Sequence, residues 1–122
     1  MAKVLGIGGV FFKAEDPAAL AAWYDKVLGF GGGDWPGAMW PHGDRGYTIW
    51  SPFKADTTYF APSTAPFMVN FIVDDLDGVL ARAAAAGVHP TGRDDSDENG
   101  RFAWLMDPAG LKIELWEPKS DA

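Results

Sequence analysis

The sequence predicts an α+β domain made of two similar halves, each with a strand, a helix and then several antiparallel strands. Two pairs of landmarks indicate this repeat. The helix N-cap candidates Asp16 and Asp75 are 59 residues apart, and the helix-ending glycines Gly29 and Gly87 are 58 apart. Because the two offsets agree to within one residue, the chain has the pattern of an internal duplication.

The first half begins with a strand-like run over residues 4–12. Asp16 and Pro17 then supply an N-cap and a favoured first helical residue, and apolar residues at helical spacing predict a helix that ends before Gly29. Glycines and prolines obscure the strands that follow, and residues 47–50 form the last clear strand of this half.

The second half repeats this order more clearly. A strand over residues 67–73 precedes a helix that starts after Asp75 and ends at Gly87. An Asp-Pro-Ala-Gly turn over residues 107–110 then separates two predicted strands, residues 101–106 and 111–116.

Period-2 alternation divides the last strand into two faces. Ile113 and Leu115 share one face, and Lys112, Glu114 and Trp116 share the other. Upstream of these strands, the acidic run at residues 94–98 is interpreted as an exposed, mobile loop.

Length and charge restrict the class of protein. A chain of 122 residues suits one domain, with module one at about residues 1–53, a linker at about 54–66 and module two at about 67–118. A net charge of −7 argues against nucleic acid as a partner, and no apolar run approaches the roughly 20 residues of a membrane span. With no cysteine and no recognisable secretion signal, the expected location is cytoplasmic.

Motifs along nearly the whole chain resemble the vicinal oxygen chelate superfamily, which includes glyoxalase I, extradiol dioxygenases, and fosfomycin-resistance and bleomycin-binding proteins. The motifs lie at residues 8–12, 16–17, 23–30, 73–77, 86–88 and 107–115. The resemblance implies two βαβββ modules that form a cupped, partly open barrel-like sheet around a small-molecule ligand or a metal, often within a homodimer.

The resemblance also allows the metal ligands of the superfamily to be compared position by position. They fall on Gly9 and Met68 in the first strands of the modules, on Thr48 or Trp50 in the last strand of module one, and on Glu114. One carboxylate among such residues is too few for a divalent ion, which needs several oxygen or imidazole ligands. His42 and His89 lie at none of these positions, so we expect no metal cofactor.

Alternation predicts which side chains face the cup. Glu114 is the candidate catalytic residue, although an inward carboxylate paired with Lys112 or Arg101 is an equally simple interpretation. The candidate ligand-binding residues are Phe11, Trp50, Met68, Asn70, Arg101 and Trp116. Ordinary core packing explains the aromatic residues about as well, and pairing with the acidic run explains Arg101 better.

The sequence therefore favours a metal-free protein that binds a small planar or apolar molecule, similar to the bleomycin-resistance type of binder. The alternative is a lyase or isomerase, glyoxalase- or dioxygenase-like, that uses Glu114 as a base or as a remnant metal ligand. Because this fold carries many activities, the fold alone does not choose between them.

Overall fold

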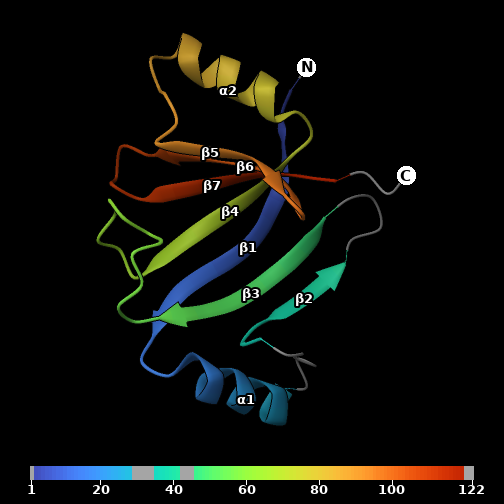
Figure 1. Cartoon of the computed structure of the whole chain (residues 1–122), viewed down its shortest axis with the longest axis vertical. Coiled ribbons are helices and arrows are strands. Elements are labelled where there is room, and N and C mark those ends of the chain that lie inside the picture. Colours follow the sequence, from blue (N-terminus) through green and yellow to red (C-terminus); the bar gives the residue numbers. More distant parts are fainter. Residues whose placement is uncertain (1, 29–34, 42–45, 120–122) are drawn as a thin grey trace.

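A computed structural model describes residues 2–28, 35–41 and 46–119. They form one seven-stranded sheet with a helix toward each end (Figure 1). Along the chain the elements are β1 (Val4–Ala14), α1 (Pro17–Leu28), β2 (Ala38–Pro41), β3 (Tyr47–Lys54), β4 (Phe67–Val73), α2 (Leu76–Ala85), β5 (Gly92–Asp97), β6 (Gly100–Met106) and β7 (Lys112–Pro118). The α+β class is confirmed.

The strand order, β2-β3-β1-β4-β7-β6-β5, reflects the duplication. The first strands of the two modules, β1 and β4, pair antiparallel at the centre of the sheet. The last strand of each module returns parallel to its first, so that β3 pairs with β1 and β7 pairs with β4. The modules are thus related by an approximate two-fold axis between the two central strands.

Capping side chains begin both helices where the sequence predicts. The Asp16 carboxylate accepts the backbone N–H of Ala19 at 3.0 Å, and the Asp75 carboxylate accepts that of Gly78 at 3.1 Å. After α2 the chain turns through Gly87, whose φ of +83° is the left-handed conformation typical of a helix C-terminus. The corresponding Gly29 lies outside the described residues.

Alternation along the strands separates two apolar clusters. On the outer face, α2 packs on a cluster formed by Val73, Leu76, Leu80, Ala103 and Leu115. On the opposite face, which we call the cup face, the central cluster is Phe11, Phe60 and Met68. Ile113 packs with the α2 cluster, whereas Glu114 is buried on the cup face, so the predicted division of the last strand is confirmed.

The acidic run is not a mobile loop, and this prediction was wrong. Most of it forms the edge strand β5, which pairs with β6 in the register Arg93 with Ala103 and Asp94 with Phe102. Two arginines offset the negative charge around this strand, because Arg93 and Arg101 each form ion pairs with Asp77 and Asp95. A charged edge strand of this kind also discourages pairing with other chains.

The connection between the two modules is partly buried in the cup rather than lying wholly on the surface. β3 continues to Lys54, four residues past the strand that the sequence indicated, and residues 55–66 then lead to β4. Phe60 in this connection is fully buried in the cup-face cluster. No described helix is long and apolar enough to cross a membrane.

A bulge in β1 brings a glycine against the cup-face amide of Asn70. The β1–β4 register shifts between Ile7 and Gly9, so Gly8 is the extra residue. A Cβ atom on Gly8 would lie 2.0 Å from Asn70 Oδ1, whereas a Cβ on Gly6 would meet nothing within 4 Å.

Gly8→Ala is therefore expected to destabilise the protein by about 1–3 kcal/mol, because the Asn70 side chain must move. Gly6→Ala on the same strand is the control and should be neutral, or stabilising by up to about 1 kcal/mol. Urea unfolding measures both free energies. Equal effects of the two substitutions would contradict the close approach at Gly8.

Candidate functional site

A single row of paired residues crosses the cup face at its centre. From β3 to β5 the row runs through Ile49, Gly9, Asn70, Glu114, Trp104 and Gly92. The carboxylate of Glu114 thus has the Asn70 amide on one side and the Trp104 indole on the other. Strand register alone brings these three polar groups together, from β4, β6 and β7.

Glu114 is the buried charge-bearing group of this row, with only 3% of its surface exposed. Its Oε1 accepts the Asn70 Nδ2–H at 2.7 Å, and its Oε2 accepts the Trp104 Nε1–H at 2.8 Å. The Tyr59 hydroxyl also donates to Oε2. Three donors converge on one carboxylate, which satisfies the group well enough for burial.

Tyr59 reaches this carboxylate from the connection between the modules. Its ring stacks on Phe53 with centroids 5.5 Å apart and meets the Trp104 ring edge-on at 6.2 Å. The neighbouring Phe60 ring packs beside Phe53 at 5.1 Å. The connection therefore fills part of the cup with two aromatic side chains, one fully buried and the other, Tyr59, 38% exposed.

Lys112 stands at the rim of the same site. Its ammonium lies 5.2 Å from the centre of the Tyr59 ring and 5.6 Å from that of Trp104, and it donates to the Tyr59 carbonyl at 2.6 Å. Partial burial lowers the pKa of Lys112, and the charge of Glu114 opposes that shift. Burial and the adjacent Glu114 carboxylate together raise the pKa of Tyr59, so its hydroxyl stays a donor at neutral pH.

Asn70 carries the one buried side-chain polar atom in the described part of the chain that lacks a hydrogen bond, its Oδ1. The Nδ2 side of the amide faces Glu114, so Oδ1 points to Gly8 instead. An unpaired buried acceptor is costly, so the contact of Oδ1 with Gly8 is the price of turning the amide hydrogens toward Glu114.

Most predicted binding residues lie on the cup face. Phe11 and Met68 form its central cluster, Asn70 contacts Glu114, and Trp116 stacks on Phe102 at 6.0 Å. Trp50 does not lie on the cup face, so its predicted place in the cup lining was wrong. It packs on Phe12, 5.6 Å away, because Ile49 and Phe53 of β3 point into the cup and alternation turns Trp50 outward.

Arg101, another candidate ligand-binding residue, does not lie on the cup face; it pairs with Asp95 of the acidic run at 3.0 Å, which is the interpretation that the sequence favoured. It lies on the face covered by α2, where it binds Asp77 at 2.9 Å and Glu117 at 3.5 Å. Its side chain joins β6 to α2 and does not face Glu114. His89 is exposed between α2 and β5, and His42 lies outside the described residues.

The register also identifies the module-one counterpart of Glu114. Asn70 pairs with Glu114 in the parallel ladder of module two, and its equivalent Phe11 pairs with Ser51 in module one. The counterpart is thus Ser51 rather than Thr48 or Trp50, which alternation turns outward. The Ser51 hydroxyl donates to the Pro36 carbonyl at 3.5 Å.

These donors do not fit a divalent metal ion. Of the chelate positions, Gly9 has no side chain, Met68 is a thioether, and Ser51 is engaged elsewhere. Both Glu114 oxygens already accept hydrogen bonds, and the Lys112 ammonium is near enough to interact with that carboxylate. Across the described ranges, no three His, Cys, Asp or Glu side chains are grouped as metal ligands.

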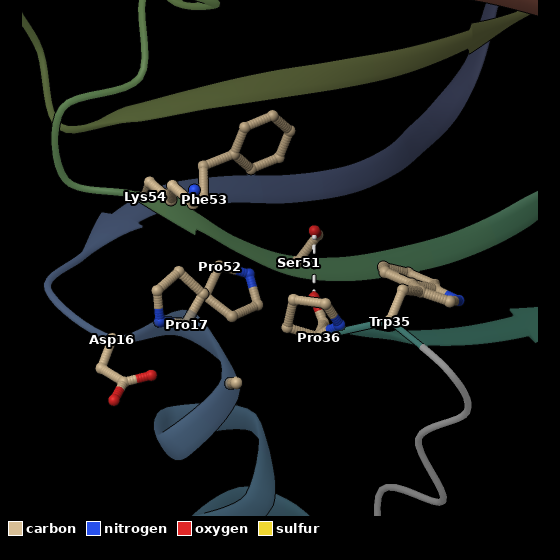
Figure 2. Close-up of a pocket in the computed structure, with 9 residues that line it drawn as sticks. Asp16, Pro17, Trp35, Pro36, Ser51, Pro52, Phe53 and Lys54 are labelled. Carbon is tan, nitrogen blue, oxygen red and sulfur yellow. Dashed lines mark hydrogen bonds between the residues drawn. The ribbon is translucent and has the colours of Figure 1, made fainter.

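A separate pocket of about 390 Å³ lies between β3 and the start of α1 (Figure 2). Its walls are mainly apolar, and they include Pro17, Trp35, Pro36 and Pro52. Figure 2 shows Pro52 pointing toward Pro17, whereas Phe53 points to the other side of the strand. The Asp16 carboxylate at its edge is occupied by capping α1. Neither Glu114 nor its three hydrogen-bond donors line this pocket, but Phe53, which stacks on Tyr59, does, so the pocket and the cup adjoin at β3.

Comparison with known proteins agrees with this geometry. The sequence matches the glyoxalase-like domain over residues 9–116. The chain belongs to this family. It is accordingly a member of the vicinal oxygen chelate superfamily, as the motifs suggested. No curated protein matches the sequence.

Solved structures show the same fold at low sequence identity. Methylmalonyl-CoA epimerase from Mycobacterium tuberculosis is 20% identical with a TM-score of 0.64, covering 95% of this chain and 89% of that one. A methylmalonyl-CoA epimerase in complex with methylmalonyl-CoA and NH₄⁺ is 17% identical, with a TM-score of 0.70 and coverage of 95% and 96%. A Legionella pneumophila structure described as NAD-dependent benzaldehyde dehydrogenase is 14% identical, with a TM-score of 0.61 and coverage of 91% and 98%.

Sequence reasoning missed two of the groups that bind Glu114. Trp104 was not among the candidate site residues, although the antiparallel pairing of β6 and β7 about the turn at residues 107–110 places it beside Glu114. Tyr59 lies in a Pro- and Thr-containing connection with no periodic pattern, so no local signal connects it with a residue 55 positions away.

Removing the Tyr59 hydroxyl tests this cluster. Tyr59→Phe should cost about 1–2 kcal/mol of unfolding free energy at neutral pH, because Glu114 loses one donor. Since the folded-state pKa of Tyr59 is raised, its contribution is fully present below the usual tyrosine pKa of about 10 and declines as the pH rises above it.

The difference between wild type and Tyr59→Phe should therefore narrow above about pH 10 in urea unfolding. Tyr47→Phe is the control, because the Tyr47 ring stacks on Trp116 at the other end of the cup. A constant difference across the alkaline range would contradict the assigned hydrogen bond.

Proposed function

We propose that this glyoxalase-like protein binds a small planar molecule in its cup without a metal, with Glu114 as the polar anchor. The observation that carries the proposal is a carboxylate, 3% exposed, at the centre of an otherwise aromatic and aliphatic surface. Binding sites commonly combine apolar walls with a few converging polar groups. The buried amide of Asn70 and the indole of Trp104 fix the carboxylate in position.

The aromatic lining favours a flat ligand. Phe102 stacks on Trp104 and Trp116 with ring planes within 13° and 5° of parallel, which forms a continuous aromatic surface beside Glu114. Lys112 at the rim adds a positive charge, so an acidic substituent on the ligand has a partner. Phe11, Met68, Asn70 and Trp116 remain the predicted contacts, and a cytoplasmic location remains a prediction.

The first test is metal-free binding. After dialysis against a chelator, the full chain should contain far less than one metal ion per molecule, and its melting temperature should not change on adding chelator, Zn²⁺ or Mn²⁺. In ¹H–¹⁵N spectra, the planar anion 2-naphthoate should shift the indole N–H signals of Trp104 and Trp116 equally with and without chelator. Stoichiometric metal with a chelator-sensitive melt would overturn the proposal.

The alternative is proton transfer by Glu114 in a lyase or isomerase. The inward carboxylate favours it, and the fold is shared with methylmalonyl-CoA epimerases, one of them in complex with methylmalonyl-CoA. Against it, three of the roughly four lone-pair sites of the Glu114 carboxylate already accept hydrogen bonds, which lowers its basicity and leaves little room for an incoming proton. We therefore rank binding first.

Glu114→Gln separates the two functions. As a base, Glu114 would exchange the C2 proton of methylmalonyl-CoA in D₂O, and the substitution would slow this exchange by about 10²–10⁴-fold. As a binding anchor, Glu114 gives no exchange, and the variant weakens binding of the planar amide 2-naphthamide, whose N–H groups can donate to this carboxylate, by about tenfold at most. Glu117→Gln is the matched control, since Glu117 lies on the same strand but contacts Leu76 and Arg101 on the other face.

We also propose a homodimer formed through the outer face of β1. Each helix packs on strands of its own module, α1 on β3 and β1 and α2 on β6 and β7 (Figure 1). Apolar side chains of β1 that are half exposed, Val4, Leu5, Ile7 and Val10, support this surface. Sedimentation should give a dimer for wild type and a monomer for Ile7→Glu; a wild-type monomer at high concentration would contradict it.

A further inference from the structure

From the surroundings of Tyr59 we infer that this side chain occupies a ligand subsite, and that the ligand that replaces it is a hydroxyaromatic compound. The inference rests on the proposed function, since it names the class of molecule that the cup takes. Four contacts around the Tyr59 phenol support the inference. The Phe53 ring stacks on it, and the Trp104 ring meets it edge-on. The Lys112 ammonium lies over it, and the buried Glu114 carboxylate accepts its hydroxyl proton.

Each of these contacts recognises a feature of a phenol rather than of tyrosine as a residue. Phe53 stacks on the flat face at 5.5 Å, and Lys112 lies over an electron-rich ring at 5.2 Å. The Glu114 carboxylate accepts a hydroxyl proton. A free molecule with the same ring and hydroxyl would find the same partners.

Tyr59 is held differently from its neighbour Phe60. Phe60 is fully buried against Phe11, Phe53 and Met68 and anchors the connection. Tyr59 is 38% exposed, and the hydroxyl bond to Glu114 together with ring contacts retains its side chain. The phenol can therefore rotate out to solvent while Phe60 keeps residues 55–66 docked.

The Glu114 carboxylate also favours a ligand that brings a donor. An ionised carboxylate accepts hydrogen bonds and cannot donate one, and Glu114 already accepts the hydroxyl proton of Tyr59. A hydroxyl group on the ligand therefore suits this position better than an acceptor group does.

The side chain of Tyr59 competes with any such ligand at the high effective concentration of a tethered group. Its removal should therefore uncover the subsite. We expect p-cresol, which reproduces the tyrosine side chain, to bind Tyr59→Ala at least about tenfold more tightly than wild type. Toluene, which lacks the hydroxyl, should bind this variant about tenfold more weakly than p-cresol.

The test titrates each ¹⁵N-labelled protein with p-cresol and toluene and follows the Trp104 indole N–H signal. Tyr47→Ala is the matched control: it removes a ring from the cup beside Trp116 and away from Glu114, so it should not discriminate between the two probes. If Tyr59→Ala fails to fold, Tyr59→Phe replaces it. That variant removes the competing hydroxyl and should also bind p-cresol more tightly than wild type does.

Equal binding of p-cresol and toluene, or no gain over wild type in either Tyr59 variant, would overturn the inference. In that case, 2-naphthoate binding by wild type would show that the metal-free binding site still stands and that only the ligand class is wrong. Failure of all three probes to bind any of the proteins would remove both the inference and the proposed function.

Discussion

The burial of one carboxylate, Glu114, is the constraint on which the cup depends. An ionised group with 3% exposure is tolerable only when hydrogen bonds replace its lost water. Here the replacements come from three separate parts of the chain: Asn70 on β4, Trp104 on β6 and Tyr59 in the connection between modules. Satisfying Glu114 therefore draws two strands and the connection together around one point.

The aromatic side chains of the cup are arranged around the Glu114 carboxylate. Trp104 is shared between the polar cluster and the stack that continues through Phe102 to Trp116, and Tyr59 is shared between the cluster and Phe53. A change at Glu114 would thus disturb both ends of the cup lining. The cup is preorganised by a polar centre with an aromatic surround, which is the arrangement that a flat ligand with one polar substituent requires.

Local signals account for the parts of the fold that the sequence predicted well. Caps at Asp16 and Asp75 determine where the helices begin, and period-2 alternation places Glu114 and Leu115 on opposite faces of the sheet. The errors are non-local. Trp50 was assigned to the wrong face because the register of β3 against β1 depends on pairing rather than on its own pattern, and the acidic β5 is a strand because β6 and two arginines stabilise it. Tyr59 was missed because four elements of module two, β4, α2, β5 and β6, lie between it and Glu114 in the chain.

The same position can serve opposite electrostatic purposes in this fold. In a chelating relative, the groups around the carboxylate must offer lone pairs to a cation. Here Asn70, Trp104 and Tyr59 all present hydrogens to Glu114, and Lys112 adds a positive charge at the rim. A cation placed among these donors would face several partial positive charges and would have to displace their hydrogen bonds. The surroundings of Glu114 thus present hydrogens where a metal site needs lone pairs, and this is the reason for proposing a metal-free ligand with a hydroxyl group.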